Sequence, residues 1–283
     1  MKKATLVFSD AHFGDAGQFY RPLMECMDRA ITQVNAFEPD EIKVIANGDV
    51  VAGRGIFRLQ EAQNVVQLGP EQIYWAGWEI KRWNSKFDKE VEWRIILGNH
   101  DNSKRENLAR QLVIFLRLLG INSKYADREY IGYFGDKEAA FHVSHGFGYS
   151  SYYANSYAEI RACWKKFIEV AQINEIHISR FIRAHVHKLN IGQEVGLDCQ
   201  IDTSGGWHKQ ERLSLEFSVR TTGVLLYLFD TNAHPPLTVK AIEANRDLLL
   251  SENKNIALHY RNMEAAGRAL SDVAGWGRVE GIW

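Results

Sequence analysis

The sequence Trp-Arg-Ile-Ile-Leu-Gly-Asn-His-Asp, residues 93–101, passes directly from an apolar run to three polar side chains. The apolar half favours a buried strand, and Gly98 permits a tight turn after it. Asn99, His100 and Asp101 then supply groups that bind metal ions or transfer protons. Ligands of open α/β sheets collect beyond the carboxyl ends of the strands. The stretch therefore predicts a strand that places a chemical site at the edge of a sheet.

The same pattern recurs four times elsewhere in the chain. Short apolar runs at 4–8, 42–46, 139–144 and 181–184 are predicted strands. Each is followed by residues of the types that bind metals, in order Asp10 with His12, Asp49, His145, and His185 with His187. Five separate segments that carry Asp, Asn and His to strand ends predict one converging site.

Helical periodicity separates these strands. Apolar spacing predicts helices over 23–37 and 108–119, and further strands follow at 223–229 and 237–242. Alternating strands and helices predict an α/β protein with a sheet covered by helices. We expect one catalytic domain over residues 1–244, with a helical, aromatic-rich insertion at about 54–92. A C-terminal helical tail is expected over 245–283, with a helix near 256–270.

Composition narrows the class of protein. The 283 residues include 34 Lys and Arg against 35 Asp and Glu, a formal charge of −1, and 46% are hydrophobic. These values indicate a soluble globular chain with no overall charge that attracts nucleic acid. The three cysteines form no Cys-x-x-Cys pair, which argues against a disulfide scaffold or a thiolate zinc site. No apolar run has the roughly 20 residues of a membrane span, so a cytoplasmic protein without a membrane partner is expected.

The predicted ligands are carboxylates, imidazoles and one amide. Such a set suits divalent or trivalent Mn, Fe, Zn or Ni. A catalytic ion needs three or four protein ligands, so seven residues suffice for two ions if one carboxylate is shared. Two metals about 3.5–4 Å apart form the clamp used for in-line displacement at phosphorus. The seven are Asp10, His12, Asp49, Asn99, His145, His185 and His187.

In this order the five blocks resemble the signature of the calcineurin-like metallophosphoesterase family. They are Asp-x-His at 10–12, Gly-Asp at 48–49, Gly-Asn-His-Asp at 98–101, His at 145 and His-x-His at 185–187. Ala184 stands where the family usually has Gly, and its methyl group is expected to crowd that turn slightly. The resemblance implies a four-layer α/β/β/α sandwich with two mixed sheets and the metal site at one rim.

The resemblance also implies a role for each residue. One ion would be bound by Asp10, His12 and His187, the other by Asn99, His145 and His185, with Asp49 bridging the two. The ions would be two divalent or trivalent metals, with manganese expected first, and the nucleophile would be a hydroxide between them. His100 would protonate the leaving oxygen or stabilise charge in the transition state. Asp101 would orient His100, or else cap the following helix.

Two regions bear on the substrate. Trp75, Trp78 and Trp83 alternate with basic residues, a pattern that suits either stacking of nucleotide bases or a helix that buries its aromatic face. After the ligand His145, the segment 147–153 carries Tyr149 and Tyr152, which form either a substrate platform or packing for the next helix. His208 is a further candidate for substrate contact.

These features predict a hydrolase, most simply a phosphodiesterase that acts on a nucleotide or nucleic acid. The alternative in the same class is a phosphomonoesterase such as a Ser/Thr protein phosphatase. A more remote alternative is a non-catalytic interaction module on the same fold. The sequence does not specify the oligomeric state.

Overall fold

A computed structural model describes most of the chain. The described residues are 1–54, 64–103, 106–135, 140–146, 161, 163–166, 168–170, 176–185, 187, 189–196, 199–207 and 222–253. Tyr149, Tyr152, His208 and the helix expected near 256–270 lie outside them.

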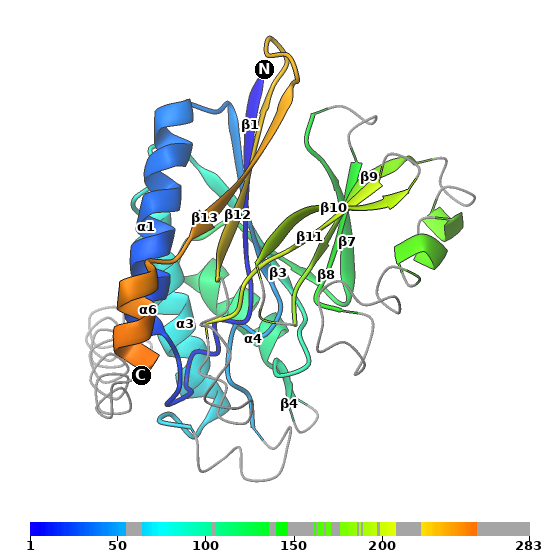
Figure 1. Ribbon diagram of the computed structural model, residues 1–283. Coiled ribbons are helices and arrows are strands. Elements are labelled where there is room, and N and C mark those ends of the chain that lie inside the picture. Colours follow the sequence, from blue (N-terminus) through cyan, green and yellow to red (C-terminus); the bar gives the residue numbers. More distant parts are fainter. Residues whose placement is uncertain are drawn as a thin grey trace.

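The first sheet has the strand order β13-β12-β1-β2-β3-β6 (Figure 1). Its strands are β1 (Lys2–Phe8), β2 (Glu41–Asn47), β3 (Val91–Ile96), β6 (Ser123–Ala126), β12 (Gly223–Asp230) and β13 (Leu237–Glu243). Strands β1, β2, β3 and β6 run parallel to one another, whereas β12 is antiparallel to both β1 and β13. Because β1, β2 and β3 are parallel neighbours, their carboxyl ends lie at one edge of this sheet.

The second sheet has the order β10-β11-β9-β8-β7. Its strands are β7 (Glu129–Tyr133), β8 (Ala140–Ser144), β9 (Ile178–Arg183), β10 (Asn190–Gly196) and β11 (Cys199–Thr203). The central strands β8, β9 and β11 are parallel, and the outer strands are antiparallel to them. A two-stranded ribbon, β4 (Asn102–Ser103) and β5 (Glu106–Asn107), follows the ligand turn after β3.

Within the described residues, three helices connect the parallel strands of the first sheet. They are α1 (Tyr20–Phe37), α3 (Gly69–Asn84) and α4 (Leu108–Leu118), and α6 (Arg246–Asn253) follows the last strand. The helices predicted over 23–37 and 108–119 therefore exist, and Gly120 ends α4 in the left-handed conformation at φ +77°. Residues 163–166 and 168–170, which follow β8 in the chain, are helical. In the described part of the chain, no helix has the length and apolar character needed to cross a membrane.

Apolar side chains pack on both faces of the sheets. One cluster joins the first sheet to α1, α3 and α4, a second fills the space between the two sheets, and a third covers the other face of the second sheet. Trp75 and Trp83 of α3 are fully buried in the first cluster. They therefore offer no face to a nucleotide base, and the core interpretation of this helix is the correct one. Lys81 instead lies over the partly buried Trp78 ring, 4.7 Å from its centroid.

The mixed α/β architecture with two mixed sheets is confirmed, whereas the number of layers stays a prediction. The short strands β6 and β7 were not expected from the sequence. Both carry partly exposed residues and lack the continuous apolar run that marks β1 or β2. Short strands of this kind depend on pairing with neighbours more than on their own sequence.

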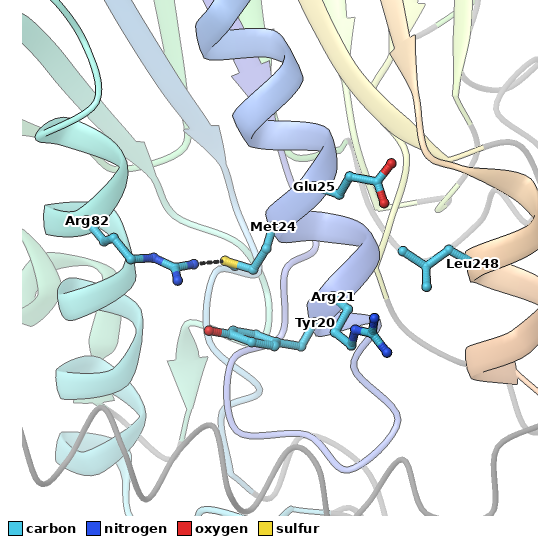
Figure 2. Close-up of a pocket in the computed structure, with 6 residues that line it drawn as sticks. All are labelled: Tyr20, Arg21, Met24, Glu25, Arg82 and Leu248. Carbon is cyan, nitrogen blue, oxygen red and sulfur yellow. Dashed lines mark hydrogen bonds between the residues drawn. The ribbon is translucent and has the colours of Figure 1, made fainter.

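A pocket of about 360 Å³ lies among α1, α3 and α6 (Figure 2). Its lining residues are Tyr20, Arg21, Met24, Glu25, Arg82 and Leu248. The Arg82 guanidinium donates to the Met24 sulfur at 2.6 Å and pairs with the buried Glu79 carboxylate at 2.9 Å. None of the predicted metal ligands lines this pocket, so the candidate site lies elsewhere.

Candidate metal centre

The register of the parallel strands brings the predicted ligands to the same level. Phe8 of β1 lies opposite Ala46 of β2, and Asn47 lies opposite Ile96 of β3. Backbone bonds continue this alignment past the strand ends, because Asp10 N–H donates to Gly48 O at 3.0 Å and His12 N–H donates to Asp49 O at 3.0 Å. The turns after β1 and β2 therefore form one connected wall of the site.

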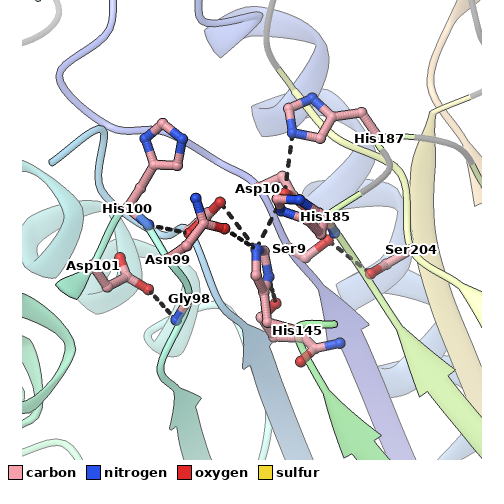
Figure 3. Close-up of polar contacts among 12 residues, drawn as sticks. Ser9, Asp10, Gly98, Asn99, His100, Asp101, His145, His185, His187 and Ser204 are labelled. Atoms are coloured by element: carbon pink, nitrogen blue, oxygen red, sulfur yellow. Dashed lines mark hydrogen bonds and ion pairs between the residues drawn. The ribbon is translucent and has the colours of Figure 1, made fainter. Parts of the chain in front are cut away.

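The second sheet reaches the same place from the other side. β8 ends one residue before His145 and β9 ends two residues before His185. The His185 N–H donates to Asp10 Oδ2 at 3.2 Å, which links a ligand turn of one sheet to a ligand of the other (Figure 3). Ala184 is buried and donates its N–H to His145 O at 3.2 Å, so its methyl group does not keep the two imidazoles out of the site.

The seven predicted ligands lie together, in two groups. Ligand atoms of Asp10, His12 and His187 lie within 4.8 Å of one another, and so do those of Asp49, His145 and His185. Asn99 joins the second group, because its Oδ1 lies 3.1 Å from His145 Nε2. The two groups adjoin, since Asp10 Oδ1 lies 3.1 Å from His187 Nε2 and 3.9 Å from His145 Nε2.

Five of these ligand residues have a left-handed backbone. The φ angles are 51° at Asp10, 49° at His12, 50° at Asp49, 70° at His185 and 53° at His187. Among non-glycine residues Asp and His tolerate this region best, yet each occurrence costs on the order of 1–3 kcal/mol. Such conformations cluster at sites where side chains must converge, and here they turn carboxylates and imidazoles toward one another.

Buried charge makes the site attractive to cations. Asp10 and Asp49 are 0% and 1% exposed. Burial, the largest single influence, raises the pKa of the Asp49 carboxyl, but the imidazoles of His145, His100 and His12 together lower it by more, and the net pKa is well below the usual value. The strongest of the three is His145, whose Nε2 lies 3.0 Å from Asp49 Oδ2. Burial lowers the pKa of His145, because it disfavours the charged imidazole, whereas the carboxylates of Asp49 and Asp10 raise it to about 10. Two enclosed carboxylates therefore draw positive charge into the space between the groups.

The donor set fits divalent or trivalent metal ions. It holds carboxylate and amide oxygens and imidazole nitrogens, and the three cysteines are buried apart from it in the apolar clusters. His145 Nδ1 lies 2.8 Å from Asn47 O, which directs Nε2 toward Asp49 and Asn99. A ring nitrogen fixed by a backbone carbonyl is the usual support for a metal-binding imidazole.

His100 lies at the margin of the centre and belongs to neither group. The backbone N–H of His100 donates to Asp49 Oδ1 at 2.8 Å, and the His100 ring lies edge-on to the His12 ring, with 4.6 Å between centroids. Nδ1 lies 2.7 Å from Ala52 O. This carbonyl therefore sets the orientation of the His100 ring.

The Asp101 carboxylate makes neither of the two contacts that the sequence predicts for it. Both carboxylate oxygens accept backbone N–H groups, Oδ1 from Val51 at 3.1 Å and Oδ2 from Gly98 at 3.0 Å. Asp101 thus joins the turn after β2 to the turn after β3, and it neither orients the His100 ring nor caps α4, whose first turn is capped by Asn107. Burial and the nearby Asp49 raise the pKa of Asp101 to about 7.

Sequence reasoning missed the segment 204–207, which follows β11 and supports the first group. Ser204 Oγ lies 2.7 Å from Ser9 Oγ, and the backbone N–H of the buried Trp207 donates to Asp10 O at 3.0 Å. Gly206 lies against the His187 ring so closely that an added Cβ would be 2.4 Å from His187 Cγ. The Gly-Gly pair at 205–206 is the one signal in the sequence that could have indicated this close approach.

Comparison with known proteins gives one family match. The sequence model of the family described as calcineurin-like phosphoesterase matches residues 4–272. Among curated proteins, none matches this chain.

Two solved structures are similar at low identity. A protein of unknown function, AQ665 from Aquifex aeolicus, is 13% identical with a TM-score of 0.34, over 70% of this chain and 88% of its own. GAP50, titled as the anchor in the inner membrane complex of Plasmodium, is 11% identical with a TM-score of 0.41, over 94% of this chain and 95% of its own.

Proposed function

The chain belongs to the calcineurin-like phosphoesterase family, and from this premise we propose that it hydrolyses phosphodiesters with two bound metal ions. The observation that carries the proposal is the pair of adjoining ligand groups at the strand ends, each with its ligand atoms within 4.8 Å. Such a pair is the arrangement used for in-line displacement at phosphorus.

Each ion has its own set of side chains in this proposal. Asp10, His12 and His187 would hold one ion, Asn99, His145 and His185 would hold the other, and Asp49 would contribute to both. When bound, the ions supply positive charge that polarises the phosphoester and activates water. Manganese is the first ion to test, with iron, zinc and nickel as alternatives.

His100 supplies a proton to the departing oxygen. Its Nδ1–H donates to the Ala52 carbonyl, so a protonated ring directs its second N–H, on Nε2, to the substrate. As the bond from phosphorus to the leaving oxygen breaks, that oxygen takes the Nε2 proton and leaves as an alcohol. A positioned general acid contributes about 10²–10⁴-fold, most where the leaving group is a poor alkoxide, as in a diester of a sugar hydroxyl.

Nucleotide and nucleic-acid diesters are the proposed substrates within this class. The buried tryptophans of α3 no longer support this choice, because they have no exposed face. Its support is the tyrosine-rich sequence directly after His145 together with the proton donor His100. Tyr149 and Tyr152 would then stack against the base or sugar.

Leaving-group dependence tests the proposal. With Mn²⁺ added, we expect faster hydrolysis of bis(p-nitrophenyl) phosphate than of p-nitrophenyl phosphate, and hydrolysis of a dinucleotide. His100→Ala should lower the rate on the dinucleotide at least 100-fold but that on bis(p-nitrophenyl) phosphate much less, because p-nitrophenolate leaves without a proton. The variant should retain its manganese, whereas Asp49→Asn should lose it.

Three outcomes would contradict this account. A strong preference for the monoester would favour the phosphomonoesterase alternative. A chain without bound transition metal or turnover would favour the non-catalytic module. Equal loss of manganese in His100→Ala and Asp49→Asn would overturn the assigned roles.

A further inference from the structure

A buried arginine lies at the end of the strand that precedes His185. Arg183, the last residue of β9, is 1% exposed. Its Nη1 donates to Ser144 Oγ at 2.5 Å and to His142 Nδ1 at 3.1 Å, and its Nη2 lies 3.5 Å from the Cys163 sulfur.

A neutral imidazole connects the Arg183 guanidinium to the Glu129 carboxylate. Because His142 Nδ1 accepts from Arg183, its Nε2 carries the proton and donates to Glu129 Oε2 at 3.0 Å. The other oxygen of Glu129 pairs with Lys166 at 2.7 Å. Burial lowers the pKa of His142 to about 4, which agrees with a neutral ring between the two charges. A chain of contacts from Glu129 to Arg183 thus crosses β7, β8 and β9.

The arginine joins the two strand ends that carry ligands. Ser144 is the last residue of β8 and directly precedes His145, while Arg183 precedes Ala184 and His185. The bond from the guanidinium to Ser144 therefore joins β8 to β9 one residue before His145 and two residues before His185. The Arg183 carbonyl also accepts the Ser204 N–H at 3.0 Å, so the same residue contacts the segment that supports Asp10.

We propose that Arg183 is a positioning residue that fixes the spacing of His145 and His185 and thereby sets the affinity of the Asp49–His145–His185 group for its metal ion. The proposal rests on the proposed function only in that this group binds metal. Arg183 does not contact the ion. It acts through Ser144 and the backbone on either side.

Metal titration of matched variants tests this role. Arg183→Met keeps an aliphatic stem but removes the charge and the donors, and Arg183→Lys keeps the charge without the two-pronged geometry. The control is Arg180→Met on the same strand, because Arg180 binds the buried Asp202 at 2.7 and 2.9 Å and makes no described contact with a ligand strand end. Both Met variants should lower the melting temperature.

Calorimetric titration with Mn²⁺ should separate the two arginines. The wild type and Arg180→Met should each bind two equivalents with the same affinities. Arg183→Met should bind one equivalent normally and the second 10- to 100-fold more weakly, the usual effect of removing support from a metal ligand. Arg183→Lys should fall between them. Titration with Co²⁺ should show altered visible absorption for one equivalent in Arg183→Met, because ligand geometry has changed.

Each contrary outcome is distinct. Wild-type binding of both Mn²⁺ equivalents by Arg183→Met would overturn the inference alone, and so would equal weakening in Arg180→Met. Absence of Mn²⁺ binding in the wild type would overturn the proposed function and this inference together. If Arg183→Met does not fold, Ser144→Ala replaces it as the test variant, because it removes the other end of the same hydrogen bond with a smaller change. Ser144→Ala should likewise weaken Mn²⁺ binding by the Asp49–His145–His185 group.

Discussion

Replacing Gly48 by alanine should damage the metal centre through a single methyl group. Gly48 has a φ of +79° in the turn between β2 and Asp49. An added Cβ would lie 2.4 Å from His145 Nδ1, 2.6 Å from its Cγ and 2.8 Å from Gly98 Cα. Carbon atoms do not approach so closely, so the imidazole must move. It then loses the 2.8 Å contact of Nδ1 with Asn47 O and shifts Nε2 away from Asp49.

Gly120→Ala is the matched control for this change. Gly120 has nearly the same backbone angle, +77°, but an added Cβ would meet nothing within 4 Å. Each alanine is unfavourable in the left-handed region by about 1–2 kcal/mol. Both variants should therefore lose at least that much free energy of unfolding, and the difference between them isolates the displacement of His145.

Manganese affinity is the measurement that distinguishes the pair. The Mn²⁺ ion of the Asp49–His145–His185 group should bind Gly48→Ala at least tenfold more weakly than it binds Gly120→Ala. Calorimetry on folded protein measures this difference. Diesterase activity should fall in parallel and recover in part at high Mn²⁺. Indistinguishable Mn²⁺ binding by the two variants would refute the placement of His145 in the centre.

Three further predictions follow from the described geometry. His142 has a folded pKa of about 4 against 6.5 for the free group, so the unfolded chain binds the extra proton between these values. The free energy of unfolding should thus fall by about 3 kcal/mol as pH drops from about 6.5 to about 4, and urea titrations of His142→Asn should lack this component. Gly206→Ala should weaken the binding of the Mn²⁺ ion by the Asp10–His12–His187 group, because its Cβ would press on His187. A calorimetric trace like that of the wild type would contradict this. Trp83→Ala should lower the free energy of unfolding by about 3–5 kcal/mol in urea while the folded fraction still binds two equivalents of Mn²⁺.

The sequence predicted well that these Asp and His side chains lie together, because its signal is local. Each ligand directly follows a strand that apolar and β-branched residues mark clearly, and parallel strands end at one edge whatever their exact register. The sequence alone therefore predicts that Asp10, Asp49 and His145 lie close together.

Other features depend on contacts between distant parts of the chain. The sequence places Asp101 beside His100, but the backbone turns its carboxylate to Val51 and Gly98 and leaves a carbonyl to hold the imidazole. The fate of Trp83 likewise depends on the sheet that α3 covers. The left-handed backbone at five of these residues and the contacts of Arg183 with His142 and Ser144 have no sequence pattern of their own, because they depend on how separate strands pair.

The span of the ligands along the chain has a consequence for assembly. Asp10 and His185 are separated by 175 positions yet share a hydrogen bond. A partly folded chain in which only one sheet has formed holds an incomplete set of donors, so we expect that cations would bind after the two sheets have docked and would not nucleate folding. Their presence should then slow unfolding and add stability by mass action, about 2.7 kcal/mol at a concentration 100 times the Kd, while refolding starts equally fast with or without them.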